Sequence, residues 1–345
     1  MLQKLTDHLT KRKWRKLAGK ARQGERLAGF FHENYIYNVD GQDCLFRFVL
    51  PNAAQMNPVA FDEVDVLGVL TQMNVPCPKL IYKAPDKSFY VEEAIHGQTM
   101  EMKYPPGDHV PEIFFDQLIE VYQKICQLDT QPFMPFLKSG WPKQGTPYEF
   151  FLALSDQNNA VYKESYLKNP KAFGFLGFGE EPYKNLREKA KSLGLRPLCF
   201  MHGDFHRGNI IENAKGEIIP IDWELSMYGD LMYCFSRNIH IGRFYENESQ
   251  MFCQKFKEKM PAAFTQGFEE DFQFYLTYEA LRSVITDTIR FPEVIKEGRF
   301  SAKKEAELCL YYADNLARIA PVLGTKVLNA SEALQKFQEW GHSNV

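Results

Sequence analysis

A short hairpin bracketed by polar residues constrains this chain more than any other feature. The stretch HGDFHRGNIIENAKGEIIPIDWE occupies residues 202–224. Its β-prone runs at 210–212 and 217–219 flank a sequence with turn chemistry, Asn-Ala-Lys-Gly at 213–216. The pattern predicts two short antiparallel strands, which return the two ends of the stretch to the same place.

Three oxygen-bearing side chains are expected to converge at the open end of this hairpin. Asn209 and Asp222 stand at its two ends, and Asp204 precedes Asn209 by five residues. Carboxylate and amide oxygens suit Mg²⁺, whereas a softer metal would require cysteine or several histidines. Phosphoryl transfer from ATP needs such a metal site beside a carboxylate that accepts the proton of the attacking hydroxyl. Asn209 and Asp222 are therefore the candidate metal ligands, and Asp204 is the candidate base.

The rest of the chain divides into a β-rich part and a helical part. Before residue 100, strands are predicted on both sides of the Asp40-Gly41 turn and at 79–83 and 88–97, with one helix at 61–74. A short connector is expected at 92–97. After residue 110 the pattern is helical apart from the hairpin. The expected helices lie at about 111–129, 147–168, 183–193, 229–240, 250–260, 268–290, 302–320 and 330–340.

Composition excludes several classes of protein. With 45% hydrophobic and 25% charged residues, the chain has the composition of an ordinary soluble protein. Its net charge of −3 gives no general attraction to nucleic acid or to anionic membranes, and no apolar run approaches the ~20 residues of a membrane span. The seven cysteines are scattered without a CxxC pair, so neither a zinc site nor a disulfide framework is indicated. No secretory signal is recognisable, and a cytoplasmic location is the expectation.

The first 28 residues form a strongly basic segment, with nine Lys or Arg against two acids, Asp7 and Glu25. Such a segment fits either a basic surface for a polyanion or a partner, or a solvated amphipathic helix. The second interpretation is the commoner one for a charge run of this kind.

The stretch HGDFHRGNII…IDWE resembles the catalytic loop and metal motif of the aminoglycoside phosphotransferase and choline kinase superfamily, whose members are relatives of protein kinases. The resemblance covers roughly residues 14–320, with its specific motifs within 202–230. It implies an α+β, bilobal protein-kinase-like fold, with a small β-rich nucleotide-binding lobe at 1–96, a hinge at 92–97 and a larger helical catalytic and substrate-binding lobe at 97–345. It also implies ATP or GTP as the phosphate donor, Mg²⁺ as the cofactor and a small-molecule hydroxyl as the acceptor.

By position, the resemblance implies a role for individual residues of this motif. Asp204 resembles the catalytic base, and Asn209 and Asp222 resemble the metal ligands. His202 resembles the histidine that buttresses the catalytic loop. His206 stands where a cation could face the transferring phosphate, although a loop residue bonded to the backbone would fit the sequence equally well.

Further positions resemble the nucleotide-binding lobe of the superfamily. Arg47, in CLFRF, stands where a basic residue contacts the α- and β-phosphates; many relatives have Lys there and some have Arg. Glu63 resembles the helix glutamate that pairs with this residue, and a plain surface ion pair is the alternative. Gly29, in AGFFHEN, stands where the phosphate-covering loop is expected, without a GxGxxG pattern. The main chain of Glu93 and Ile95, in VEEAIHG, resembles the hinge that hydrogen-bonds the purine.

Glu224 and Asp230 are two further acids close to the end of the hairpin. Glu224 lies two residues beyond Asp222, where it would either extend the metal site or be solvated. Asp230, in YGDLMYCF, resembles the Gly-Asp-x-x-x-Asp-Leu pattern of the superfamily. The second Asp of that pattern is absent, because Cys234 and Phe235 stand there. This departure removes an expected support of the catalytic loop.

The leading interpretation is a kinase that moves the γ-phosphate of ATP to a hydroxyl of a small molecule. Acids in the helical half favour a cationic acceptor such as an aminoglycoside, choline or another amino alcohol. Aromatic residues there could form a cage for a quaternary ammonium or pack in the core. The acids are Glu246, Glu248, Glu269, Glu270, Asp271, Glu279 and Asp287. The aromatic residues are Phe244, Tyr245, Phe272, Phe274, Tyr275 and Tyr278.

Two other functions compete with this interpretation. A protein-kinase-like signalling enzyme is disfavoured because Asp222 is followed by Trp-Glu rather than Phe-Gly, and because the next helix begins too soon for a long activation segment. A non-catalytic nucleotide-binding module that holds a partner is the alternative from a different class. Cys234 favours this module, whereas the presence of Asp204, Asn209 and Asp222 argues against it.

Overall fold

The computed structural model describes residues 2–27, 32–50 and 59–342, and the chain forms two compact units. Unit 1 consists of Met1–Lys138, Phe200–Met227 and Phe244–Lys255, and unit 2 of Ser139–Cys199, Tyr228–Arg243 and Phe256–Val345. The α+β fold expected from the sequence is confirmed, with a small antiparallel sheet in the N-terminal region and a larger helical C-terminal part. The division into lobes at 1–96 and 97–345 stays a prediction.

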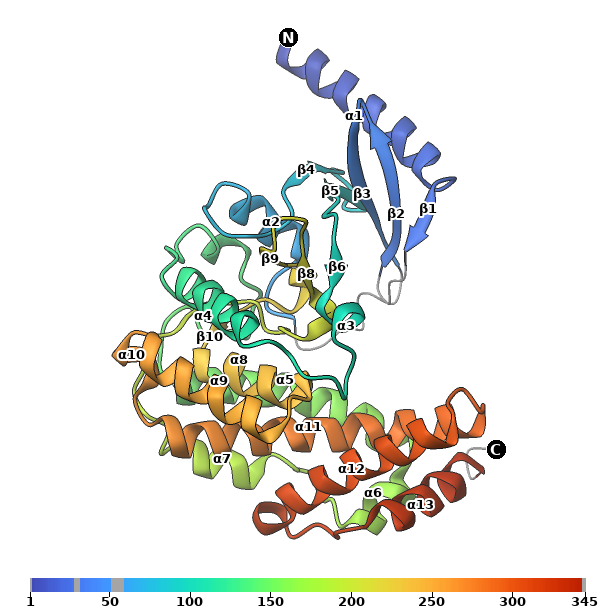
Figure 1. The fold of residues 1–345 in the computed structure, drawn as a ribbon, viewed down its shortest axis with the longest axis vertical. Coiled ribbons are helices and arrows are strands. Elements are labelled where there is room, and N and C mark those ends of the chain that lie inside the picture. Colours follow the sequence, from blue (N-terminus) through green and yellow to red (C-terminus); the bar gives the residue numbers. More distant parts are fainter. Residues whose placement is uncertain (1, 28–31, 51–58, 343–345) are drawn as a thin grey trace. The chain divides into compact units, whose positions relative to one another are not determined.

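A five-stranded antiparallel sheet in the order β1-β2-β3-β5-β4 forms the N-terminal part of unit 1 (Figure 1). Its strands are β1 (Glu25–Leu27), β2 (His32–Val39), β3 (Gln42–Val49), β4 (Leu80–Lys83) and β5 (Phe89–Glu93). β2 and β3 are joined by Asp40 and Gly41, whose φ angles are 54° and 91°. Two positive φ angles in succession are what a tight two-residue hairpin turn requires, which explains the Asp-Gly dipeptide.

A second, three-stranded sheet in the order β6-β8-β9 contains the hairpin predicted within residues 202–224. Its register pairs Ile210 with Pro220 and Glu212 with Ile218. The strands are β6 (Gln98–Thr99), β8 (Ile210–Glu212) and β9 (Ile218–Pro220). The helices of unit 1 are α1 (Leu2–Ala21), α2 (Glu63–Leu70), α3 (Met100–Lys103) and α4 (Glu112–Cys126), with 3₁₀ turns at Met134–Phe136, Arg207–Asn209 and Trp223–Leu225. α9 (Glu246–Lys259) begins in unit 1 and ends in unit 2.

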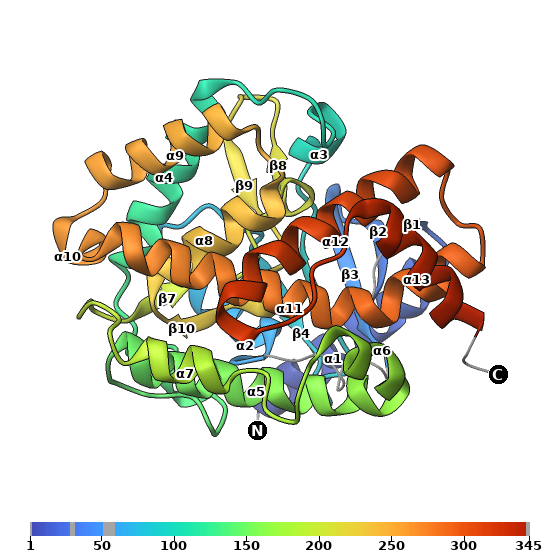
Figure 2. The ribbon, with the colours of Figure 1, turned by 90° about the horizontal axis from the view of Figure 1, so that it is seen from below.

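Unit 2 consists mainly of helices. They are α5 (Pro147–Lys168), α6 (Pro170–Leu176), α7 (Lys184–Ala190), α8 (Leu231–Gly242), α10 (Ala262–Thr265), α11 (Phe268–Lys296), α12 (Ala302–Leu323) and α13 (Ala330–His342). The long helix α11 packs against α5, α8, α12 and α13 (Figure 2). The boundary between the units falls within β7 (Cys199–Met201) and β10 (Met227–Gly229). None of the described helices is long and apolar enough to cross a membrane.

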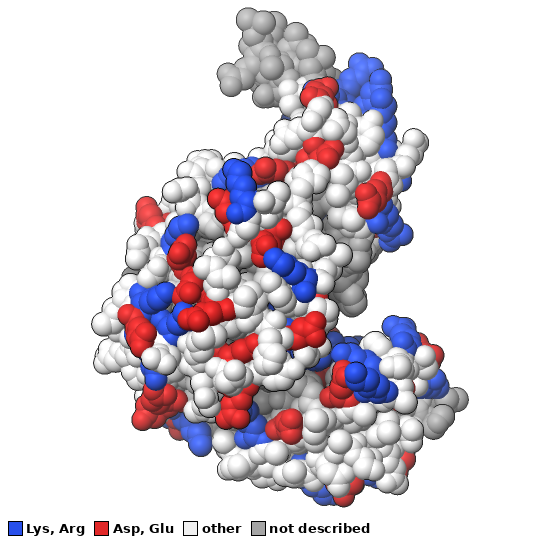
Figure 3. All heavy atoms as spheres, in the orientation of Figure 1, with Lys and Arg blue, Asp and Glu red and all other residues white. Residues whose placement is uncertain are grey.

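The basic N-terminal segment forms the amphipathic helix α1, whose apolar side lies on the five-stranded sheet. Trp14 stacks on Tyr82 with ring centroids 5.3 Å apart, and Ala18 and Ala21 join the core of the sheet. Lys and Arg side chains gather over the described part of this helix (Figure 3). Two of them, Lys13 and Arg15, form exposed ion pairs with Asp40 and Asp86, and Arg22, just beyond the helix, pairs with Glu33.

Candidate active site

His202 links the loop 202–209 to the segment that leads into Asp222. Its Nδ1 accepts a hydrogen bond from the backbone N–H of Asp204 (3.2 Å), and its Nε2 donates to the carbonyl oxygen of Ile221 (2.9 Å). The side chain is fully buried. Burial lowers the pKa of His202 to about 4, so the ring stays neutral and keeps one acceptor nitrogen. These contacts are the ones that a buttressing residue would need.

The hairpin brings Asp204, Asn209 and Asp222 into one region. The Asn209 side-chain nitrogen donates to the backbone oxygen and to Oδ2 of Asp204, both at 3.2 Å. The backbone N–H of Ile221 donates to the carbonyl oxygen of Asn209 (2.9 Å), which places Asp222 beside it. Both of these side-chain hydrogen bonds use the nitrogen of Asn209, so its amide oxygen is the atom that a metal ion would need.

Asp222 adopts a left-handed backbone conformation, with φ of 64° and ψ of 65°. This region is sparsely populated by residues other than glycine, although Asp and Asn enter it more readily than most. Such conformations cluster at functional sites, where the surrounding structure holds them in place. The carboxylate of Asp222 is held in turn by Arg47, whose Nη2 donates to Oδ1 at 2.9 Å.

Arg47 and Glu63 form a buried ion pair. Arg47 Nη1 donates to Glu63 Oε1 at 2.6 Å, and the two residues are each only 6% exposed. Glu63 also accepts hydrogen bonds from the Tyr90 hydroxyl (2.5 Å) and from the backbone N–H of Trp223 (3.0 Å). A plain surface ion pair, the alternative left open by the sequence, is thus excluded. One guanidinium joins the first residue of α2 to the carboxylate of Asp222.

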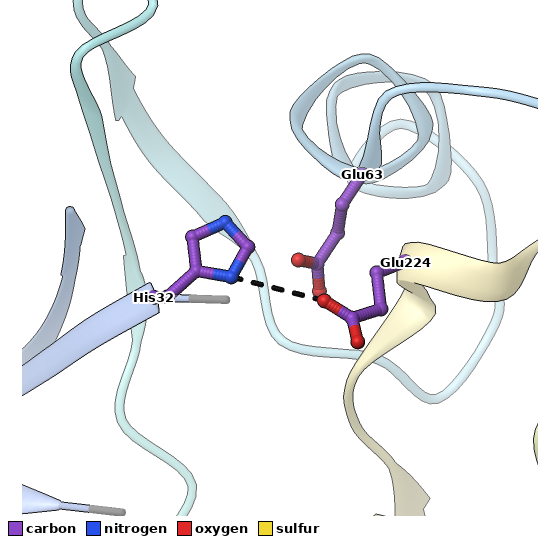
Figure 4. Close-up of side chains that lie close together, drawn as sticks. All are labelled: His32, Glu63 and Glu224. Carbon is purple, nitrogen blue, oxygen red and sulfur yellow. Dashed lines mark ion pairs between the residues drawn. The ribbon is translucent and has the colours of Figure 1, made fainter. Parts of the chain in front are cut away.

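Carboxylic acids outnumber the cations around Arg47. Glu92 lies 3.8 Å from Arg47 and is buried, and Glu224 approaches His32 at 3.8 Å (Figure 4). Burial, reinforced by the negative charge of Asp222, raises the pKa of Glu224 to about 8. Burial raises the pKa of Glu92 to about 8 as well. An additional cation in this region would therefore be stabilised.

His32, Glu63 and Glu224 each place one potential ligand atom within 4.8 Å of the others (Figure 4). This set does not fit a divalent metal, because Arg47 Nη2 lies 3.3 Å from His32 Nδ1 and would repel it. Burial, together with Arg47, lowers the pKa of His32 to about 3, so the ring is neutral. The oxygens of Asn209 and Asp222 are the donors that suit Mg²⁺ better.

A cavity of about 360 Å³ lies beside these groups, within the size range of small-molecule sites. One part of its wall is apolar, formed by Leu27, Ile36, Leu45, Pro78, Ala94, Ile95, Ile211 and Ile221. Another part is polar, formed by His32, Asn34, Arg47, Glu92, Glu93, Asn209, Asp222 and Glu224. Glu63 reaches this site through Arg47, and Gly29 lies outside the described residues.

His206 turns one side of its ring to the backbone and the other toward Asp204. Its Nδ1 accepts a hydrogen bond from the backbone N–H of Gly208 (3.0 Å), so a neutral ring carries its proton on Nε2. Nε2 lies 3.7 Å from Asp204 Oδ2. The backbone bond that the sequence left open is present, and it aims the donor nitrogen at the candidate base.

Arg207 ties the segment 104–108 to the loop 202–209, a link that the sequence argument missed. Its guanidinium donates to the carbonyl oxygens of Tyr104 (2.9 Å), Pro105 (3.1 Å) and Asp108 (3.4 Å). The side chain is buried and lies over the ring of Phe244. Arg207 is part of the motif HGDFHRGN, but the sequence does not indicate which carbonyl groups its side chain contacts.

Asp230 belongs to a buried network in unit 2. Its carboxylate accepts two hydrogen bonds from Arg196 (3.0 and 2.6 Å) and one from the Tyr275 hydroxyl (2.9 Å), and it caps the start of α8. Arg196 also pairs with Asp271. Cys234, which stands where the superfamily has a second Asp, is buried within α8. Asp230 thus has a structural role of its own.

Most acids that favoured a cationic acceptor already have partners. Four of the seven are buried and paired, as Glu248–His109, Asp271–Arg196, Glu279–Arg237 and Asp287–Arg290. Among the aromatic residues, Phe272, Tyr275 and Tyr278 are buried against other rings of unit 2. These groups therefore give little support to a cationic acceptor or to an ammonium cage.

The comparison with protein families gives one match to this chain. The model of the phosphotransferase enzyme family (APH) matches residues 26–248, which is more than half of the sequence. No curated protein matched the chain.

Several solved structures are similar in fold. A thermostable mutant of aminoglycoside phosphotransferase APH(4)-Ia, in ternary complex with ADP and hygromycin B, has a TM-score of 0.55 at 15% identity, over 87% of this chain and 92% of that one. Choline kinase LicA from Streptococcus pneumoniae has a TM-score of 0.54 at 15% identity, over 92% and 99%. A choline/ethanolamine kinase family protein from Mesorhizobium loti has a TM-score of 0.54 at 14% identity, over 91% and 92%. At these identities the likeness establishes a shared fold and nothing about substrates.

Proposed function

Because the chain belongs to the phosphotransferase enzyme family, we propose that it transfers the γ-phosphoryl group of ATP to a hydroxyl of a small molecule, with Mg²⁺ as cofactor. One observation carries the proposal. Asn209 and Asp222 line the same cavity as Arg47, and Asp204 is hydrogen-bonded to Asn209 at its edge. This arrangement supplies hard oxygen ligands, a buried cation and a carboxylate base in one place.

The nucleotide would occupy the 360 Å³ cavity. Its apolar wall, which includes Leu45 and Ile221, suits the faces of a purine base. The main chain of Glu93 and Ile95 would hydrogen-bond the edge of that base, and Arg47 would meet the phosphates. The same wall would accept the base of GTP, so both ATP and GTP should be tried as the phosphate donor.

The metal would be held by Asn209 and Asp222, whose oxygens match the preference of Mg²⁺. Bound Mg²⁺ would neutralise the charge that spreads over the phosphoryl group in the transition state. Glu224 is a further candidate ligand, because it lines the same cavity and the carboxylic acids in this region outnumber the cations. Arg47 would hold the carboxylate of Asp222 in place for this task.

Asp204 would accept the proton of the attacking hydroxyl. As the acceptor oxygen forms its bond to the γ-phosphorus, the bond to the bridging oxygen of ADP breaks and ADP leaves. His202 would keep the loop in position through its two bonds to the main chain. His206, with its donor nitrogen toward Asp204, would face the transferring group.

The fold does not determine which class of molecule accepts the phosphate. The acids of the helical half do not determine it either, because most of them already have partners. Aminoglycosides and choline enter as candidates because similar structures are an aminoglycoside phosphotransferase and choline kinases. Simple sugars, homoserine and macrolides belong to the same test. Cys234, in place of the second Asp of the superfamily, is the feature that favours the alternative of a non-catalytic binding module.

The decisive experiment is ADP release from Mg-ATP across a panel of hydroxyl acceptors, with Asp204→Asn in parallel. The panel contains aminoglycosides, choline, ethanolamine, simple sugars, homoserine and a macrolide. We expect one acceptor to raise ADP release in the parent, and the variant to lower turnover by about 10²–10⁴-fold while still binding ATP. Near-normal turnover in Asp204→Asn would reject Asp204 as the base. Tight Mg-ATP binding without turnover on any acceptor would favour the binding module.

A further inference from the structure

A second cavity, of about 470 Å³, lies in unit 1 next to the candidate nucleotide cavity. His32 and Glu224, which lie close together in Figure 4, line both cavities. The second cavity is formed by the start of α2 together with the end of β3 and the start of β5. Its apolar wall includes Val49, Phe61, Val64 and Phe89.

Three lysines, Lys83, Lys87 and Lys138, stand at the rim of this second cavity. Lys87 and Lys138 share one partner, Asp62, at 2.7 and 2.9 Å. Lys83 pairs with Asp65. Three ammonium groups against two carboxylates leave one positive charge uncompensated at the rim. The lysine side chains are one third to one half exposed, so a ligand can reach them.

We propose that this cavity binds an amphipathic monoanion, a carboxylate or sulfonate carried on an aromatic or aliphatic body. The anionic group would meet Lys87 and Lys138, and the body would lie against Phe61, Phe89 and Val64. The volume lies in the range of sites for drug-sized ligands. Glu63 and Glu224 also line this cavity, but both are more buried than the lysines, so the anionic group would stay at the lysine rim.

Such a ligand would be coupled to the nucleotide cavity, a step that rests on the proposed function. It would contact Phe61, Asp62 and Glu63, which form the entry and first residue of α2. Glu63 holds Arg47, and Arg47 holds the carboxylate of Asp222. If the ligand binds best when the contacts from Glu63 through Arg47 to Asp222 are intact, it must raise the affinity for Mg-nucleotide. The nucleotide must then raise the affinity for the ligand by the same factor.

The test uses the full chain and 8-anilinonaphthalene-1-sulfonate, an aromatic monoanion that fluoresces when bound. Val49→Trp fills the cavity from a position that is 42% exposed, so the fold should tolerate it. The double variant Lys87→Gln, Lys138→Gln reverses the charge at the rim, leaving one lysine against two aspartates. Lys171→Gln, an exposed lysine of unit 2, is the matched control. Thermal melting checks that each variant is folded.

We expect saturable binding to the parent and to the control, weakened about tenfold by Val49→Trp and about fivefold by the lysine double variant. Saturating Mg-ATP should not displace the probe, and the probe should tighten binding of a fluorescent Mg-ATP analogue about twofold or more. Three results would overturn the site. They are displacement of the probe by Mg-ATP, no saturable binding to the parent, and binding to Val49→Trp and to the lysine double variant that equals binding to the parent. Loss of the coupling alone would overturn the coupling. If the ATP analogue does not bind while the probe still responds to Val49→Trp, the proposed function fails and the site stands.

Discussion

The exchange Arg47→Lys tests how the candidate active site depends on one side chain. The guanidinium uses two nitrogens for two carboxylates, Nη1 for Glu63 at 2.6 Å and Nη2 for Asp222 at 2.9 Å. Lysine keeps the charge but has a single nitrogen, so it cannot occupy both positions. One charge-assisted hydrogen bond, with a net value of about 1.5–3 kcal/mol, is then lost. If Asp222 is the carboxylate that loses its partner, this energy corresponds to a factor of roughly 10–150.

The assay is kcat/KM for ATP, measured over a range of Mg²⁺ concentrations with the acceptor that the panel identifies. We expect Arg47→Lys to lower kcat/KM by roughly 10–150-fold at low Mg²⁺ and by less at high Mg²⁺, because the metal itself can then orient Asp222. Arg15→Lys is the matched control, because the pair of Arg15 with Asp86 lies on the surface and the same exchange there should leave kcat/KM unchanged. Full activity of Arg47→Lys at low Mg²⁺ would refute the reasoning.

Three further predictions concern the metal, the buried network of unit 2 and the response to pH. Asp222→Ala should abolish Mg²⁺-dependent turnover, and an unchanged Mg²⁺ titration would reject Asp222 as a ligand. Asp230→Ala should lower the free energy of unfolding by about 1.5–3 kcal/mol, because Arg196 loses the hydrogen bonds to Asp230 although Asp271 still pairs with it; a urea-measured loss below about 1 kcal/mol would contradict this. Glu92 and Glu224 keep a proton up to about pH 8 when folded but only to about 4.5 when unfolded, so the folded state binds more protons and these two groups should lower the free energy of unfolding as pH rises from about 4.5 to 8. Each group contributes at most about 1.4 kcal/mol per pH unit, and Glu224→Gln should flatten the slope in denaturation experiments; an unchanged slope would contradict the assignment.

The hairpin and its polar bracket could be predicted from the sequence because the information is local. Asp204, Asn209 and Asp222 lie within nineteen residues, and the turn between the strands fixes which ends meet. The superfamily expected from this motif is confirmed by the family match. The α+β fold was readable for the same reason, since helical and β-type periodicity change over near residue 100. The shortest elements, such as β1, β6 and α3, were missed because two to four residues carry no period.

The surroundings of Arg47 could not be predicted, because they depend on strands that pair across the sheet. Tyr90 stands opposite Arg47 in the register of β3 and β5, and this pairing sets its hydroxyl beside Glu63. His32 reaches the same place from the first residue of β2. No spacing in the sequence encodes these approaches.

The acids of the helical half suggested a cationic acceptor because their partners could not be predicted from the sequence. A sequence shows how many carboxylates a helix carries, but not which arginines of other helices reach them. Glu279 and Arg237 lie on α11 and α8, and their buried pair forms only when those helices pack. Charges that seemed available for an acceptor are thereby used inside unit 2.

The carbonyl groups around Arg207 have a consequence for how this part of the molecule opens. A segment can fluctuate on its own only if few bonds join it to its neighbours. The segment 104–108 has three backbone oxygens bound to one side chain of the loop that carries Asp204. The two stretches should therefore expose their amides to exchange together, as one cooperative unit, although about a hundred residues of chain separate them.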